Sequence, residues 1–194
     1  ALQQLVRKSA RDVNIEINPA VKRYYVEMQP ATLHDPLGDW ERIQTALWDQ
    51  HQIKDLNIDY TILTGLQNVV REAEWKITAF VWCGDRSAEV IRVAPGFAEF
   101  TLGLAVDVGT TSVAGFLCDL DTGRVLATES IMNPQTPYGD DVMARITYSM
   151  TRDNGLETMH AAIIKGLNKI VARVCETAGY QSDDVLEAVL VGNT

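Results

Sequence analysis

A chain of 194 residues with 46% hydrophobic and 22% charged residues has the composition of an ordinary globular protein, which excludes overall disorder. The net charge is −9, and residues 98–194 hold 6 basic against 13 acidic residues, without the clustered Lys and Arg that nucleic-acid phosphates require. We therefore expect no nucleic-acid partner. No apolar run is long enough to span a membrane and no signal peptide is evident, so we expect no membrane partner and a cytoplasmic location.

The first predicted elements are a strand and a helix. Residues 21–28, VKRYYVEM, are rich in β-branched and aromatic side chains, which predicts a strand, and the proline-rich stretch 30–39 predicts a loop. Asp35 and Pro36 are the candidate N-cap and first residue of a helix. The apolar face of this helix has the i, i+3, i+7 spacing, with Trp40, Ile43 and Leu47.

A second helix and two strands complete the first unit. Apolar residues recur with helical period over residues 60–71, and β-rich runs at 75–82 and 88–94 flank a turn-like segment. The predicted order is β-α-α-β-β, an α+β arrangement. It closes at residues 94–96, Ala-Pro-Gly, where we place a domain boundary.

The second half of the chain has a different pattern. Three strands joined by tight turns, an antiparallel meander, are predicted over residues 102–107, 113–119 and 124–131. The later elements are a helix with the stripe Val142, Met143, Ile146 and Met150, a long helix over 156–178 ending near Gly179, and a buried strand from residue 185. The predicted order of this unit is β-β-β-α-α-β, and we expect the chain to have an α/β fold.

The stretch LAVDVGTTSVAG, residues 104–115, places small polar residues between two predicted strands. Gly109 permits backbone angles that expose consecutive N–H groups, and Asp107 offers a carboxylate to a magnesium ion or its bound waters. Hydroxyl donors for phosphate oxygens come from Thr110, Thr111 and Ser112. The stretch predicts a cradle for a metal-bound polyphosphate, with a plain polar hairpin turn as the alternative.

Two other phosphate motifs do not fit this stretch. A P-loop needs a lysine and opens into a helix, whereas here no lysine is present and a strand is predicted to follow. The G-x-G-x-x-G fingerprint of dinucleotide-binding folds is absent as well. Because residues 98–194 are acidic, a phosphate bound there must be held by backbone amides and a metal rather than by a basic patch.

The pattern D-x-G-T-T-S between hydrophobic strands resembles the phosphate-binding hairpin of the actin, sugar-kinase and heat-shock-chaperone ATPases. That superfamily has a ribonuclease H-like fold in which a β-β-β-α-β-α half binds the nucleotide phosphates against a second, similar half. The resemblance implies that residues 98–194 are the N-terminal half of such an ATPase domain.

Six segments carry a longer resemblance that covers nearly the whole chain, at residues 21–28, 71–82, 89–96, 133–150, 155–179 and 189–194. They are similar to sequences of the reductive activators of corrinoid proteins, which are ATP-driven electron donors that return a corrinoid from Co(II) to Co(I). The resemblance implies a linker over residues 1–20 and a small middle domain over residues 21–97, ahead of the ATPase half.

This resemblance also implies cofactors, a partner and roles for residues. The partner is a corrinoid protein, the cofactors are ATP and Mg²⁺, and Asp107 is the catalytic residue that organises the metal. The implied nucleotide-binding residues are Gly109, Thr110, Thr111, Ser112, Asn193 and Thr194. The family carries a [2Fe–2S] cluster on an N-terminal domain, but the three cysteines of this chain lack the ligand spacing for one, so we expect the cluster only in the full-length protein.

The chain also stops before the second phosphate loop of the superfamily, so we expect it to be part of a longer activator. Two other functions stay open: a phosphotransferase of the same superfamily that acts on a small metabolite, and a non-enzymatic module in which residues 1–97 recognise a protein. The oligomeric state, a homodimer included, is open too.

Four further polar residues lie between the third strand of the meander and the next helix. Asp140 and Asp141 are expected to cap the helix that follows, with a place in the cleft as the alternative. Asn133 and Gln135 are expected to form a turn.

Overall fold

The structure of the chain, a computed structural model, describes residues 16–84 and 87–192. It divides into two compact units, one of residues Ile17–Thr101 and one that begins at Leu102, and each is described by itself. Most of the expected linker, residues 1–15, and two candidate site residues, Asn193 and Thr194, lie outside the described residues. Within them, no helix has the length and apolar character needed to cross a membrane.

The first unit is a four-stranded mixed sheet with three helices. Its elements are β1 (Val21–Glu27), α1 (Asp39–His51), β2 (Leu56–Ile58), α2 (Tyr60–Leu63), α3 (Leu66–Glu72), β3 (Lys76–Cys83) and β4 (Ala88–Pro95). The strand order is β1-β3-β4-β2, in which β3 pairs antiparallel with β1 and β4, and β2 pairs parallel with β4.

Three details of the predicted first unit are wrong. Helix α1 begins at Asp39 rather than Pro36, because the Asp35 carboxylate instead accepts a hydrogen bond from the Leu37 amide and pairs with the guanidinium of Arg42. The predicted helix 60–71 is divided in two at Gly65, the residue with the least favourable helix propensity after proline. Strand β2 is only 3 residues long, too short to show a period of two in the sequence.

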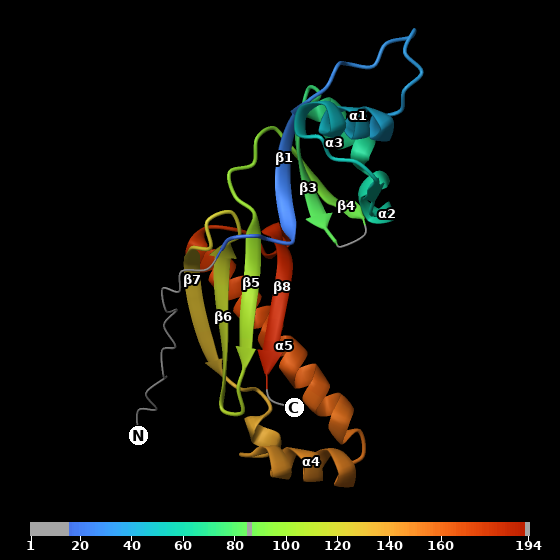
Figure 1. Cartoon of the computed structure of the whole chain (residues 1–194). Helices are drawn as coiled ribbons and strands as arrows, with labels where there is room; N and C mark the ends of the chain where they lie inside the picture. The colour runs from blue at the N-terminus through green and yellow to red at the C-terminus, as the bar shows by residue number, and fades with distance from the viewer. Residues whose placement is uncertain (1–15, 85–86, 193–194) are drawn as a thin grey trace. The chain divides into compact units, whose positions relative to one another are not determined.

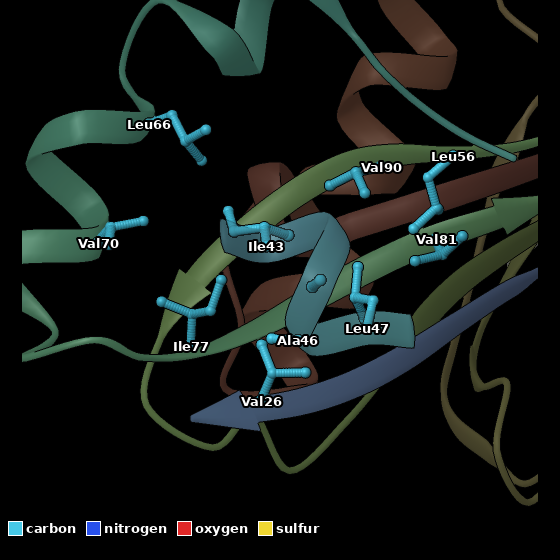
Figure 2. Packing of buried hydrophobic residues seen from close by; sticks show 11 residues of the cluster. Val26, Ile43, Ala46, Leu47, Leu56, Leu66, Val70, Ile77, Val81 and Val90 are labelled. Carbon is cyan, nitrogen blue, oxygen red and sulfur yellow. The ribbon is translucent and has the colours of Figure 1, made fainter. Parts of the chain in front are cut away.

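The core of the first unit lies between the sheet and its helices, and Figure 2 shows the side chains that fill it. Helix α1 contributes Ile43 and Leu47 from its apolar face, as the sequence spacing predicts, and both are fully buried. Strand β3 adds Ile77, Ala79 and Val81 from one face. All four tryptophans of the chain, Trp40, Trp48, Trp75 and Trp82, belong to this unit.

The second unit has the predicted order β-β-β-α-α-β. Its elements are β5 (Leu102–Val108), β6 (Ser112–Asp119), β7 (Val125–Met132), α4 (Val142–Thr151), α5 (Gly155–Ala178) and β8 (Val185–Gly192), with short 3₁₀ turns at Thr136–Tyr138 and Ser182–Asp184. Strands β5, β6 and β7 form the antiparallel meander, and β8 pairs parallel with β5 at the edge, in the order β7-β6-β5-β8. The chain thus has the expected α/β fold.

Helix α5 runs along one face of this sheet (Figure 1) and ends at Gly179, whose φ of +82° is the left-handed cap expected there. The helix approaches closely at Gly115, where a Cβ atom would lie 2.2 Å from Cγ2 of Ile170. Because Gly115 is the register partner of Val106, both residues lie on the sheet face that α5 covers.

Two apolar segments of the second unit are exposed: the apolar stripe of α4, and β8, which the sequence predicts to be a buried strand. The stripe on α4 is largely exposed, from 39% at Val142 to 80% at Met150. In β8, Val189, Leu190 and Val191 are each more than half exposed, because β8 lies at the sheet edge and α5 packs on β6 and β7.

Candidate functional site

The hairpin between β5 and β6 brings the predicted site residues together. Asp107 is the last residue but one of β5, Ser112 is the first residue of β6, and the turn between them is closed by a hydrogen bond from the Gly109 amide to the Ser112 carbonyl oxygen, 2.9 Å long. Alternation along the strands places Asp107 and Ser112 on the sheet face opposite α5. Both side chains are half-buried, and Thr111 at the tip is exposed.

Gly109 is required in this turn because of space. A Cβ atom at this position would lie 2.9 Å from the Ser112 carbonyl oxygen, closer than real Cβ atoms approach. The φ angle of Gly109 is not in the left-handed region, so the turn does not need glycine for its backbone conformation. Any larger residue would therefore push the two sides of the hairpin apart.

The carbonyl oxygens of the turn are bound from outside the hairpin. The side-chain amide of Asn133 donates to the Gly109 carbonyl over 2.8 Å, and the backbone N–H of Asn133 donates to the Thr111 carbonyl over 2.8 Å. Arg145 on α4 donates from Nη2 to the carbonyl between them, that of Thr110, over 2.6 Å. Three successive carbonyls are thus held by two residues.

These bonds determine the direction of the turn amides. In a trans peptide the C=O and the following N–H point in opposite directions, and the described part of the chain has no cis peptide bond. With the carbonyls of Gly109 and Thr110 held by Asn133 and Arg145, the N–H groups of Thr110 and Thr111 point away from those two residues. Among the described residues neither N–H has a hydrogen-bond partner, so both are available to an anion.

Asn133 and Arg145 are the two residues that the sequence analysis does not assign to the site. Asn133 forms the expected turn, since its Oδ1 accepts from the Gln135 amide over 2.8 Å, but it is also 2% exposed and clamps the hairpin. Arg145 is 9% exposed, and its Nε donates to the Gly139 carbonyl over 2.9 Å. The sequence contains one signal for Arg145: it is a cation three residues after Val142, beside the apolar stripe of α4.

A cavity of about 290 Å³ lies on the carbonyl side of the turn, between the hairpin and helices α4 and α5. Its polar wall includes Thr110, Asn133 and Arg145, and its apolar wall includes Ile146 and Met159. The free amides point away from this wall. The cavity and the predicted phosphate cradle therefore lie on opposite sides of the turn. Figure 1 shows α4 beyond the end of the sheet at which β5 turns into β6.

The other candidates have structural roles in this unit. The Asp141 carboxylate caps α4 by accepting from the Ala144 amide over 2.7 Å, as expected for a helix N-cap. Burial raises the pKa of the Cys118 thiol, and burial followed by the charge of Asp184 raises the pKa of the Cys175 thiol, which keeps both thiols protonated at neutral pH. Cys83, in the first unit, is exposed.

Within residues 16–84 and 87–192, no group of three or more His, Cys, Asp or Glu side chains is arranged to hold a metal ion. Asp107 fits a different kind of site, in which one carboxylate binds Mg²⁺ and the remaining ligands are phosphate oxygens and water. The donors at Thr110 and Thr111 and the carboxylate at Asp107 are the complementary groups for a magnesium-bound polyphosphate.

Comparison with known protein families assigns the chain to one of them. A model described as the RACo linker region matches residues 10–99, and a model described as the RACo middle region matches residues 102–194. The two matches together account for nearly all of the sequence, and the chain belongs to the RACo family.

Individual relatives agree with this assignment. The corrinoid activation enzyme RamQ of Eubacterium limosum is 37% identical over 92 residues, which are 47% of this chain and 16% of RamQ. A solved structure of a reductive activator for corrinoid, iron-sulfur protein superimposes with a TM-score of 0.76 at 30% identity, over 93% of this chain and 29% of the activator. The chain therefore spans less than a third of the length of either relative.

An archaeal actin homolog was also matched, over 78% of this chain and 63% of its own length. Its TM-score of 0.36 and identity of 10% are too low to establish a common fold.

Proposed function

We propose that the full-length protein is an ATP-dependent activator of a corrinoid protein, and that the hairpin Asp107–Ser112 binds the phosphates of Mg-ATP. The observation that carries the proposal is the similarity to the corrinoid, iron-sulfur protein activator, which extends over 93% of this chain at 30% identity. The corrinoid partner, the electron transfer from a [2Fe–2S] cluster to Co(II), and the dependence on ATP all belong to this proposal.

The hairpin supports the nucleotide part of the proposal through its donors. Two amides without partners among the described residues, at Thr110 and Thr111, would donate to phosphate oxygens, with the adjacent hydroxyls as further donors. Asp107 would bind the magnesium ion or its waters. Bound Mg-ATP would supply the free energy for an electron transfer that is otherwise uphill.

The residues of this chain would contribute binding and orientation. Asn133 and Arg145 hold the turn in one conformation before any ligand arrives, so little conformational entropy is lost on binding. Gly109 keeps the two sides of the hairpin close together, because a Cβ atom there would meet the Ser112 carbonyl oxygen.

The test is the rate of Co(II) to Co(I) reduction in a corrinoid protein by the full-length protein, with and without Mg-ATP. We expect reduction to require Mg-ATP and to slow markedly in Asp107→Asn. The control Glu176→Gln removes the same charge from an exposed position near the end of α5 and should follow the wild type.

Reduction at full rate without ATP would contradict the proposal. Transfer of a labelled γ-phosphate to a small metabolite would favour a phosphotransferase instead. Partner binding with no effect of nucleotide and no effect of Asp107→Asn would favour a non-enzymatic module.

A further inference from the structure

Arg145 is a buried cation whose hydrogen bonds go to backbone carbonyls. Its Nε binds the Gly139 carbonyl over 2.9 Å and its Nη2 binds the Thr110 carbonyl over 2.6 Å, and the side chain is 9% exposed. No carboxylate lies within ion-pair distance of it among the described residues. A guanidinium in such a place has two effects: it fixes the acceptors that it binds, and it adds a positive charge beside the turn.

We propose that Arg145 is the positioning residue of the hairpin, because its bond to the Thr110 carbonyl holds the Thr110–Thr111 peptide in the orientation that presents the Thr111 N–H to an anion. If this peptide turned over, the Thr110 carbonyl would face the anion and repel it. Asn133 holds the peptides before and after it through the carbonyls of Gly109 and Thr111. The central peptide of the turn depends on Arg145 alone among the described residues.

The same contacts connect the hairpin to helix α4. Arg145 lies on α4 and Gly139 precedes it, so the guanidinium joins the segment that leads into α4 to a turn 35 residues earlier. A displacement of α4 would therefore change the orientation of the Thr110–Thr111 peptide. The part of this inference that concerns an anion rests on the proposed binding of Mg-ATP; the part that concerns the shape of the hairpin does not.

Two variants separate position from charge. Arg145→Met removes both the bonds and the charge, whereas Arg145→Lys keeps the charge on a single ammonium group that lacks the fork needed to bind two carbonyls at fixed positions. The matched control is Arg173→Met, which removes the same charge from an exposed position on α5. Arg173 lies about 27 Å along the helix from Gly155, the first residue of α5.

Two measurements on the full-length protein test the proposal. One is amide hydrogen exchange at Asn133, whose N–H donates to the Thr111 carbonyl, without nucleotide. The other is the KM for ATP together with kcat. We expect faster exchange at Asn133 in both Arg145 variants, a KM about tenfold higher in Arg145→Met with kcat less affected, and only partial recovery of KM in Arg145→Lys.

Each outcome has a definite reading. Exchange and KM equal to those of Arg173→Met would overturn the proposal, and full recovery in Arg145→Lys would show that only the charge matters, which also overturns it. If the wild type binds no Mg-ATP but exchange at Asn133 rises in both Arg145 variants, the positioning role stands and the proposed function fails. If Arg145→Met does not fold, Arg145→Lys gives the same two readouts.

Discussion

The side-chain amide of Asn133 donates a hydrogen bond of 2.8 Å to the carbonyl oxygen of Gly109, 24 residues earlier in the chain. This bond ties the loop after β7 to the turn between β5 and β6. Both polar atoms of the Asn133 side chain are hydrogen-bonded, since its Oδ1 accepts from the Gln135 amide over 2.8 Å. In the sequence the site looks like a local hairpin. The structure shows that a residue far along the chain stabilises it.

Replacing this residue should destabilise the second unit. Asn133→Ala leaves the Gly109 carbonyl and the Gln135 amide without their partners, which should lower the free energy of unfolding by about 1–3 kcal/mol. Urea unfolding followed by far-UV circular dichroism measures it. Asn168→Ala, at an exposed position on α5, is the control and should cost nothing.

Gly109→Ala should weaken nucleotide binding more than it weakens folding. An ideally placed Cβ at residue 109 lies 2.9 Å from the Ser112 carbonyl oxygen. The two atoms must move apart, and this distorts the turn that presents the amides. We expect a higher dissociation constant for Mg-ATP, measured by calorimetry. At Gly65 a Cβ would meet no atom within 4 Å, so Gly65→Ala should leave binding unchanged. Equal affinities in the two variants would contradict the role of Gly109.

Gly115 and Ile170 form a tight contact that a double-mutant cycle can measure. In Gly115→Ala the new methyl would lie 2.2 Å from Cγ2 of Ile170, so we expect an overpacking cost of about 1–3 kcal/mol in the free energy of unfolding. Ile170→Ala removes the clashing atom and leaves a cavity. The double variant should be more stable than the sum of the single costs predicts, and strict additivity would show that α5 does not pack there.

The first unit should lose stability in acid partly through Asp35. The hydrogen bond from the Leu37 amide, followed by the Arg42 guanidinium, lowers the pKa of Asp35 from its usual 3.8. A lowered pKa in the folded state gives stability that is present above pH 3.8 and is lost as the pH falls through the folded pKa.

Asp35→Asn should therefore be less stable than the wild type at neutral pH, with a difference that shrinks below pH 3.8. Tryptophan fluorescence during urea unfolding follows this unit selectively, because all four tryptophans lie in it. Glu72→Gln, at an exposed position on α3, is the control. A difference that is the same at all pH values would contradict the linkage.

The hairpin and the meander could be predicted because they are local. Alternating apolar residues in β5 and β6 and the small residues from Gly109 to Ser112 are adjacent in the sequence, and their pattern determines a tight antiparallel turn. The extents of α5 and its glycine cap were likewise predicted, from helical periodicity and from Gly179.

Other features depend on contacts between distant residues. The bond from Arg145 to the Thr110 carbonyl spans 35 residues, and periodicity in one segment gives no information about such a pair. Strand β2 exists because Leu56, Asn57 and Ile58 pair with β4 some 32 residues later. The exposure of β8 was missed because a continuous apolar run is typical of a strand buried on both faces, and a sequence does not show which strand lies at an edge.

The most direct test of the hairpin as the phosphate site is a crystal structure of the full-length protein with Mg²⁺ and a non-hydrolysable ATP analogue. We expect phosphate oxygens within hydrogen-bond distance of the backbone N atoms of Thr110 and Thr111, with the magnesium ion or its waters at the Asp107 carboxylate. A triphosphate bound away from this turn, with both amides facing solvent, would contradict the assignment of the site.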